Sequence, residues 1–441
     1  MRICLLLSCL CIAPAFAEPI SFKNEIAPLL VRNCQACHGP KKAEGRWRTD
    51  TFEKFAAAGE STLALVTAKD LNNSELWRRL TAEDPKERMP LDADPLPAAD
   101  LAKVKRWIEE GAVFDGPDPK VALAGYIPPP VHPAAPEKYA ATLPITALAF
   151  SPDGSQVFAS GYHEITVWNA ADGQLVRRIG NVAQRTYALS FSADGSQLLA
   201  ASGDPGRLGE ARIFNAATGE LVKVLGAAAD VVYDARLNPA GDKLATAGAD
   251  GVIRIFDVAA GKEILAIASH SDWVHCVAWS PDGSKLASGS RDKTAKAFTA
   301  ADGKLLFSYS QHNGPVRGVL FPDEEQVISA GDSRVMRWQI ADGKRTGEFG
   351  TGAEIQRLAP AGEFFLVTNA EPKIRLANVK ECKSIRELQG LKDWGVSAAL
   401  HVGTKRVAAG AFDGEIKVWD SNDGKPVTSW IAAPGYVPRG T

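Results

Sequence analysis

The sequence is poor in residues that bind metals or form disulfides. Its 441 residues include only seven histidines, seven cysteines and three methionines. Three cysteines fall within the first 11 positions, two stand at 34 and 37, and the last two are Cys276 and Cys382. Because those two lie two repeats apart, we expect buried free thiols there rather than a disulfide. A structural zinc site needs about four Cys or His ligands, and too few stand near positions 34 and 37.

The chain also has little net charge and no long apolar run. Its 50 basic and 52 acidic residues nearly cancel, so nothing suggests the cationic surface that nucleic-acid binding requires. Arg2, the apolar core Ile3 to Ile12 and the small-residue site Ala15-Phe16-Ala17 have the order of a secretory signal. This core is too short for a membrane span. We therefore expect residues 1–17 to be a signal peptide cleaved after Ala17, and a soluble periplasmic protein with no nucleic-acid partner and no membrane span.

The most specific short motif is Cys34-Gln35-Ala36-Cys37-His38. A C-x-x-C-H run is typical of covalent haem c attachment. The two thiols add to the porphyrin vinyl groups, and the adjoining imidazole becomes the proximal iron ligand. A thioredoxin-like redox pair would instead need a βαβ setting, which the flanking sequence does not have. The motif therefore predicts haem c bound through Cys34, Cys37 and His38.

Helical patterns surround this motif within residues 18–118. We expect helices leading from Ser21 into Cys34, around Ser74 to Leu80, and from about Ala98 to Gly111. Between the last two stands Met89, the only methionine between residues 1 and 336. A thioether ligand raises the potential of a haem. Since no histidine lies between 38 and 132, Met89 is the best candidate for the distal ligand.

Residues 20–118 resemble the planctomycete-type cytochrome c domain. The residues that carry the resemblance are Ile20-Ser21-Phe22-Lys23, Ile26-Ala27-Pro28-Leu29-Leu30, Cys34 to Pro40 with Lys41-Lys42, Asn73-Ser74-Glu75-Leu76, Arg88-Met89-Pro90, Pro95-Leu96 and Trp107 to Ala112. The resemblance implies one covalent haem, with Cys34 and Cys37 as thioether partners, His38 proximal and Met89 distal. The chain departs from the family pattern at Gly45 to Thr51, where packing of Trp47 on the haem is left open.

A basic group follows the haem motif, made of Lys41, Lys42, Arg46 and Arg48. It fits either a solvated surface loop or a surface that guides an acidic redox partner to the haem.

From Gly116 to Tyr139 the chain contains seven prolines, which predict a semi-rigid spacer over residues 119–139, with His132 on its surface. Beyond it the sequence repeats every 38 to 46 residues, the equivalent positions being Phe150, Phe191, Leu237, Trp279, Leu320, Leu358 and Leu400. Four short strands per repeat of this length indicate a β-propeller blade. Residues 140–433 resemble the WD40 family, which implies seven blades, and residues 434–441 form a C-terminal tail. The expected fold is a small all-α domain followed by an all-β propeller.

Histidine, serine and aspartate residues in the repeats could have a functional or a structural role. The fifth repeat is the most complete, with His312, Ser329, Asp332 and Trp338 where the family builds a buried hydrogen-bond chain. The fourth repeat has His270, Ser288 and Asp292 but ends in Phe298, and the sixth is degenerate. We expect these residues to be structural.

Charges also interrupt the inner strands, at Asp234, Arg236, Arg317 and Arg357. They fit either an anion or partner site in the central channel or ion pairs between blades. We find no catalytic residue set.

These features favour a periplasmic monohaem cytochrome that transfers electrons, with a propeller that docks a periplasmic redox protein or another protein partner. Two alternatives stay open. One is a haem-containing oxidoreductase with a substrate or second cofactor on the propeller, and the other is a redox-sensing scaffold.

Overall fold

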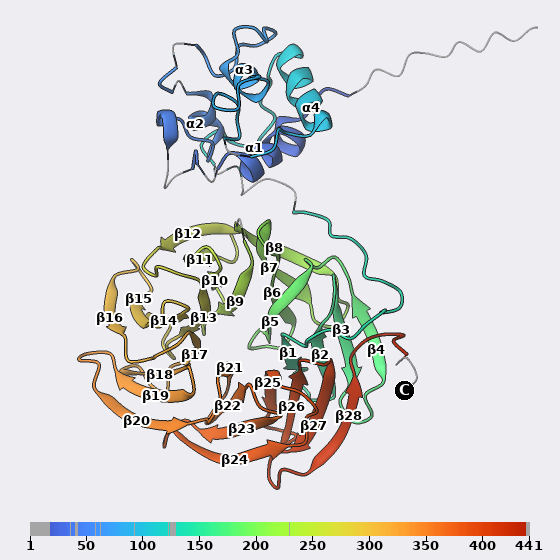
Figure 1. Ribbon diagram of the computed structural model, residues 1–441, viewed down its shortest axis with the longest axis vertical. Helices are drawn as coiled ribbons and strands as arrows, with labels where there is room; N and C mark the ends of the chain where they lie inside the picture. The colour runs from blue at the N-terminus through green and yellow to red at the C-terminus, as the bar shows by residue number, and fades with distance from the viewer. Residues whose placement is uncertain are drawn as a thin grey trace, which may run out of the picture. The chain divides into compact units, whose positions relative to one another are not determined.

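The computed structural model describes residues 18–437, apart from positions 36, 40–42, 58, 62, 92, 122, 124–128 and 229. The predicted signal peptide and residues Lys41 and Lys42 lie outside this described part. The chain forms two compact units, Met1–Pro128 and Pro129–Thr441. None of the helices in the described part of the chain has the length and hydropathy that a bilayer span requires. The expected order of a helical unit followed by a seven-bladed propeller is confirmed (Figure 1).

The first unit consists of short helices joined by loops. Its elements are η1 (Phe22–Ile26), α1 (Ala27–Asn33), η2 (Glu44–Arg46), α2 (Phe52–Ala56), α3 (Glu75–Leu80) and α4 (Ala98–Glu109). Ser21 caps the first helix by accepting a hydrogen bond from Asn24 N. The three predicted helices are present. The sequence analysis missed α2, whose cap is Thr51 and whose single buried residue is Phe55.

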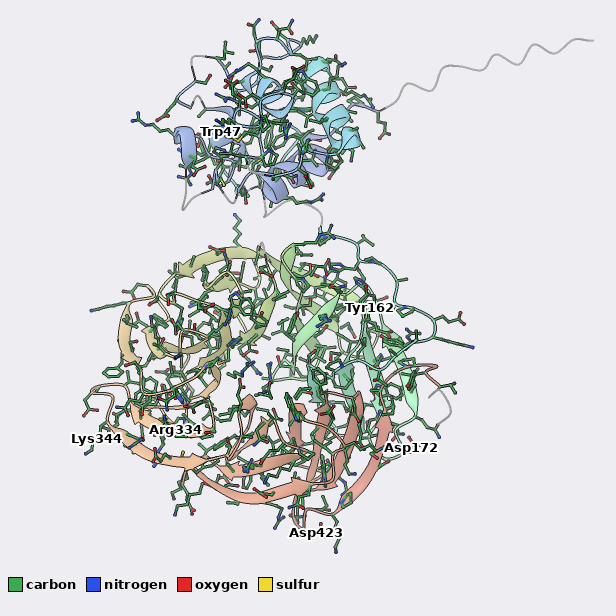
Figure 2. All side chains as sticks on the ribbon, viewed as in Figure 1. Trp47, Tyr162, Asp172, Arg334, Lys344 and Asp423 are labelled. Carbon is green, nitrogen blue, oxygen red and sulfur yellow. The ribbon has the colours of Figure 1, made fainter. Side chains whose placement is uncertain are left out.

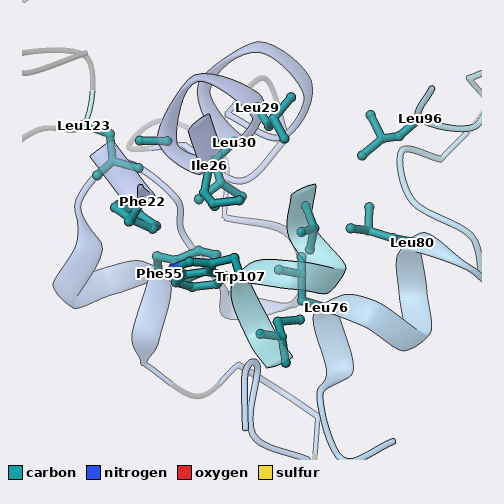
Figure 3. Close-up of a cluster of buried hydrophobic side chains, with 13 residues drawn as sticks. Phe22, Ile26, Leu29, Leu30, Phe55, Leu76, Leu80, Leu96, Trp107 and Leu123 are labelled. Atoms are coloured by element: carbon teal, nitrogen blue, oxygen red, sulfur yellow. The ribbon is translucent and has the colours of Figure 1, made fainter. Parts of the chain in front are cut away.

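An apolar core holds these short helices together (Figure 3). Phe22, Phe55 and Trp107 are fully enclosed, and the ring of Phe22 lies 5.5 Å from that of Trp107. Aromatic pairs at such distances stabilise a core by about 0.5–1.5 kcal/mol beyond their area burial. Leu123 is also completely buried in this core, and its N–H donates to Asp50 O at 2.8 Å. The helical unit therefore extends past residue 118, into the stretch expected to be spacer.

The second unit has seven antiparallel four-stranded sheets arranged around a centre (Figure 1). Blade one consists of β1 (Leu148–Phe150), β2 (Gln156–Ser160), β3 (Ile165–Asn169) and β4 (Leu175–Ile179). Blade two consists of β5 (Arg185–Phe191), β6 (Gln197–Asp204), β7 (Leu208–Asn215) and β8 (Leu221–Ala228). Blade three consists of β9 (Val232–Leu237), β10 (Lys243–Gly248), β11 (Ile253–Asp257) and β12 (Lys262–Ile267). Blades four and five are β13 (Val274–Trp279), β14 (Lys285–Ser290), β15 (Ala295–Thr299), β16 (Leu305–Tyr309); β17 (Val316–Leu320), β18 (Gln326–Gly331), β19 (Arg334–Gln339), β20 (Arg345–Gly350). Blades six and seven are β21 (Ile355–Ala361), β22 (Phe364–Asn369), β23 (Lys373–Asn378), β24 (Lys383–Gln389); β25 (Gly395–His401), β26 (Arg406–Ala411), β27 (Glu415–Asp420), β28 (Pro426–Ile431).

The turn between the first two strands of a blade explains why the sequence motif repeats. In blade one, Asp153 accepts hydrogen bonds from Ser151 Oγ at 2.6 Å and from Ser155 N at 3.0 Å. These bonds lower the pKa of Asp153 to about 2. Gly154 follows with a φ of 72°, which favours glycine. A Ser-Pro-Asp-Gly run thus fixes a tight hairpin that starts each such blade.

The ring closes between blades one and seven without exchange of a strand, because each sheet is built from four consecutive strands. Ile145 N donates to Ala411 O of blade seven at 3.2 Å. Tyr139 N donates to Pro434 O at 3.0 Å, so residue 434 belongs to this closure rather than to a free tail. Apolar side chains of both blades form one buried cluster that includes Phe150, Trp168 and Ile416. Closure therefore combines apolar packing with hydrogen bonds between blades one and seven.

The segment of residues 129–139, which we name the strap, packs against blades one and two. His132 is buried, contrary to the surface position expected from sequence, and its Nε2 lies 2.6 Å from Glu210 Oε1. Arg212 is completely buried and donates to Glu210 at 2.5 Å and to Pro130 O at 2.5 Å. Tyr139 Oη donates to Glu164 at 2.6 Å. The expectation of a spacer over all of 119–139 is therefore wrong, because buried polar groups fasten the strap.

Candidate haem site

The described residues of the C-x-x-C-H motif, Cys34, Gln35, Cys37 and His38, lie on one turn at the end of α1. Cys34 N donates to Leu30 O at 2.9 Å, and His38 N donates to Cys34 O at 2.9 Å. The next residue must be glycine, since a Cβ atom on Gly39 would lie 2.4 Å from Gln35 O. This turn presents two thiols and one imidazole from a single short segment.

The imidazole of His38 is held by its own neighbours. Its Nδ1 lies 2.9 Å from Glu44 O, so that Nδ1–H donates to the carbonyl and Nε2 carries the free lone pair. No hydrogen-bond partner for Nε2 occurs among the described residues. Metal-bound histidines commonly donate their second ring nitrogen in this way, which fixes the ring and the tautomer. The side chain is therefore prepared as a nitrogen ligand.

Two further residues, whose roles the sequence analysis did not find, hold this geometry. Thr49 is completely buried, and both its N–H and its Oγ1 donate to His38 O, at 2.7 and 3.1 Å. Gln35 Nε2 donates to Thr49 O at 2.9 Å. The ring of Trp47 lies 4.9 Å from that of His38, and its Nε1 donates to Phe55 O at 3.0 Å. Trp47 (labelled in Figure 2) thus packs beside the expected proximal ligand.

The two thiols of the turn differ in exposure, and neither forms a disulfide. Cys34 is half-buried and Cys37 is exposed. Desolvation, and then the proximity of Cys37, raises the pKa of Cys34 to about 12, so this sulfur is a neutral thiol at neutral pH. No cluster of three or more His, Cys, Asp or Glu side chains that suits a metal ion occurs in the described part of the chain. The turn fits haem c, which takes two sulfurs and one imidazole, better than a zinc site.

Met89 is half-buried on the loop between α3 and α4. Its N–H donates to Arg79 O at 2.9 Å, which ties the loop to the last turns of α3. Glu75, at the start of α3, accepts from Arg78 and Arg79 at 2.8 Å each. The hydrogen bond from Arg78 is the main reason why the pKa of Glu75 is lowered to about 2. This network positions the loop, while the role of Met89 opposite His38 stays a prediction.

The basic group near the motif is partly paired. Arg48 donates two hydrogen bonds to Asp50 at 2.7 Å each, and Arg46 pairs with Glu60 at 3.1 Å. Arg46 is largely exposed, whereas Arg48 is half-buried. The described part of the group thus resembles a solvated loop more than a concentrated positive patch.

Comparison with known proteins supports both halves of this description. Residues 34–92 match the family model for planctomycete cytochrome C. Residues 138–169, 219–257, 261–298, 303–339 and 382–420 match the family model for the WD domain, G-beta repeat. The chain joins a planctomycete-type cytochrome c domain to a seven-bladed WD40 propeller.

Two further comparisons concern the whole chain. No curated protein matches it. A chain from the solved structure "Crystal Structure of Mitotic Checkpoint Complex" is similar with a TM-score of 0.56 and 20% identity, over 67% of this chain and 98% of that chain. A likeness at this identity shows the fold alone.

The inner three strands of blades two and six lie outside the matched WD40 segments, yet both blades are complete sheets. Blade six, which was expected to be degenerate, lacks the WD40 sequence motif but forms a complete four-stranded sheet.

His270 and His312 form the expected hydrogen bonds inside the WD40 propeller, but the fourth blade is better connected than the fifth. His270 Nδ1 lies 2.8 Å from Asp292 Oδ2, and its Nε2 lies 2.7 Å from Ser288 Oγ. In blade five, His312 Nε2 lies 2.8 Å from Ser329 Oγ, and Trp338 Nε1 donates to the same oxygen at 3.1 Å. Asp332, however, is 4.0 Å from His312 Nδ1, which is buried without a partner among the described residues. The expectation that blade five is the most complete is therefore wrong at this aspartate.

The charges on the inner strands of the WD40 propeller form ion pairs. Asp234 of β9 lies 3.2 Å from Arg236 and 3.4 Å from Arg357 of β21, so the second pair joins blades three and six. Arg317 of β17 pairs with Glu354 at 3.1 Å. Ion pairs between blades, one of the two interpretations left open by the sequence, are therefore present. Cys276 and Cys382 are buried free thiols, also as expected.

Proposed function

We propose that this protein is an exported monohaem c-type cytochrome that carries electrons, and that its propeller docks a protein partner. The observation that carries the proposal is the state of His38. Its Nδ1 is fixed on Glu44 O at 2.9 Å, its Nε2 is available, and two free thiols stand on the same turn. His270, a structural histidine of the propeller, instead uses both ring nitrogens inside the protein.

In this proposal one haem is held by thioether bonds from Cys34 and Cys37, by His38 Nε2 and by Met89. When bound, the haem would supply one-electron chemistry, and a thioether ligand would raise its potential. If His38 and Met89 both bound the iron, no coordination position would be left for a substrate. This is the arrangement of an electron carrier rather than of a catalyst.

The residues around the turn serve this role by keeping it rigid. Glu44 O and the two donors of Thr49 fix the ring and the backbone of His38. A ligand that does not reorient between oxidation states keeps the reorganisation energy of electron transfer small. The ring of Trp47 packs beside the imidazole, 4.9 Å away, and adds to this support.

The signal-like residues 1–17 support the proposed export to the periplasm. In this proposal the haem is attached to the exported chain. The propeller supports docking, since rigid blades offer a broad binding face. It also presents exposed aromatic side chains, among them Trp394 and Phe412, which are 49% and 53% exposed. Aromatic residues are enriched at protein interfaces.

Replacement of Met89 tests the proposal. Met89→Leu keeps the volume and removes the sulfur, and Met336→Leu is the matched control, since Met336 is completely buried in the propeller. We expect the purified native protein and the control to give the same low-spin haem spectrum. Met89→Leu should lose that spectrum and shift the potential by on the order of 0.1 V, a fraction of the span of about 0.8 V that axial ligands set.

Electron exchange with a small redox protein in stopped flow completes the test. The native protein and the control should react at equal rates, and Met89→Leu should react more slowly. A native protein with a high-spin haem that binds added ligands would contradict the carrier function. An unchanged spectrum in Met89→Leu would contradict the assignment of Met89.

A further inference from the structure

The middle of the propeller contains a cavity of about 290 Å³. It lies among the innermost strands of blades three to six, and the charged residues that line it are Asp234, Arg236, Arg317 and Arg357. Figure 2 shows side chains with nitrogen atoms reaching into the middle of the ring. Three guanidinium groups therefore share one cavity with a single carboxylate.

The ion pairs described above do not balance these charges. Asp234 serves both Arg236 and Arg357, so one carboxylate faces two guanidinium groups. Glu354, the partner of Arg317, is not part of the cavity lining, and its side chain is 51% exposed. The cavity itself thus keeps an excess of positive charge, which is costly in a partly desolvated place unless an anion compensates it.

The arginines also have unused hydrogen-bond donors. Arg357 donates to Tyr187 O at 2.8 Å and to Asp234, and Arg317 donates to Glu354. The Nε of Arg317 is buried with no partner among the described residues. A guanidinium offers more N–H donors than these, in a fork that matches the oxygens of carboxylates and phosphates.

The pKa of the neighbouring His275 is affected by the same arginines. Desolvation lowers its pKa to about 4, and repulsion from Arg317, Arg291 and Arg357 adds to the shift. His275 is therefore neutral at pH 7 and does not compete for an anion.

We propose that this central cavity binds a small oxyanion dianion through Arg236, Arg317 and Arg357. The cavity volume lies just below the range of about 300–1,000 Å³ that is typical of small-molecule sites, so the ligand is small. Inorganic phosphate and a short dicarboxylate share the required chemistry, which is two or more oxygens that accept from guanidinium forks. An anion in this place bridges blades three, five and six. The proposal does not depend on the haem function.

Calorimetric titration of the full-length haem protein tests this site, with inorganic phosphate in one arm and succinate in the other. Both arms are run at constant ionic strength against sodium chloride. The arm with the lower Kd identifies the ligand class. Arg317→Gln should weaken binding at least tenfold, which corresponds to about 1.4 kcal/mol. This variant is expected to fold, because the ion-pair partner of Arg317 is the exposed Glu354.

Two further variants make the outcome decisive. Asp234→Asn removes the only carboxylate among the described residues that line the cavity. It should tighten binding several-fold, a gain that general destabilisation would not produce. Arg345→Gln is the matched control, because Arg345 lies on the outer strand β20 in an exposed pair with Glu348, and it should leave the Kd within about twofold. Equal heats for phosphate, succinate and chloride would overturn the proposal, and so would an Arg317→Gln variant that binds as tightly as the native protein.

Discussion

Removal of Arg212 should destabilise the propeller strongly, because this arginine has no exposed surface and holds the strap. Its side chain donates to Glu210, to Asn181 O at 2.8 Å and to Pro130 O. Arg212→Met therefore breaks the contact with the strap. The Glu210 carboxylate stays buried without the guanidinium, next to the imidazole of His132. Breaking a buried ion pair from one side costs about 3–5 kcal/mol.

The double variant Arg212→Met with Glu210→Leu separates lost packing from an uncompensated charge. Both charges are now absent, so the double variant should be less destabilised than the sum of the single variants, with a coupling of about 2 kcal/mol or more. The matched control is Arg254→Met. Arg254 pairs with Asp250 at 2.5 Å, but its side chain is 19% exposed, and its loss should cost about 1 kcal/mol or less.

Urea unfolding of the propeller, followed by tryptophan fluorescence, measures these free energies. If the effects of the Arg212 and Glu210 substitutions are additive, or if Arg212→Met costs no more than Arg254→Met, the argument for a buried charge network is refuted. The strap would then be a loosely attached linker.

Three further predictions follow from single contacts. Gly39→Ala should reduce covalent haem incorporation, since its Cβ would lie 2.4 Å from Gln35 O. The control Gly180→Ala should not, because no atom lies within 4 Å of the added Cβ. Haem-stained gels compare the two variants. The Glu75 carboxylate, whose pKa falls from 4.5 to about 2 on folding, stabilises the helical unit above pH 4.5 and loses this effect as the pH falls to about 2. Circular dichroism should show a shallower acid transition in Glu75→Gln, and an unchanged one would exclude this role. Asp292→Ala should destabilise the propeller by about 1 kcal/mol more than Asp332→Ala, because Asp292 alone is within hydrogen-bond distance of its histidine; equal melting points would contradict this.

The sequence predicted those parts of the fold that local patterns determine. A repeat of about 40 residues with a Ser-Pro-Asp-Gly turn defines a blade by itself, because the turn satisfies its own hydrogen bonds around Asp153. The helices ending near Cys34 and Gly111 follow from their periodic apolar faces. Blade six shows the limit of this approach, since β21 to β24 form a full sheet without the motif.

Contacts between distant residues could not be predicted in this way. His132 and Glu210 are 78 positions apart, and a histidine in a proline-rich stretch has the sequence signature of an exposed linker. Thr49 looks like an ordinary loop residue, although its two hydrogen bonds to His38 O fix the candidate site. The haem motif itself was visible because its chemistry needs three residues at fixed local spacing.

The state of the haem after denaturation tests the central claim most directly. The purified protein is unfolded in acid and extracted with an organic solvent, and the absorbance of the chain and of the extract is recorded. The account predicts that the pigment stays with the native chain, and that it is extracted from the variant with both Cys34→Ser and Cys37→Ser. Release of the pigment from the native chain would contradict covalent attachment, and with it the proposed role of this protein.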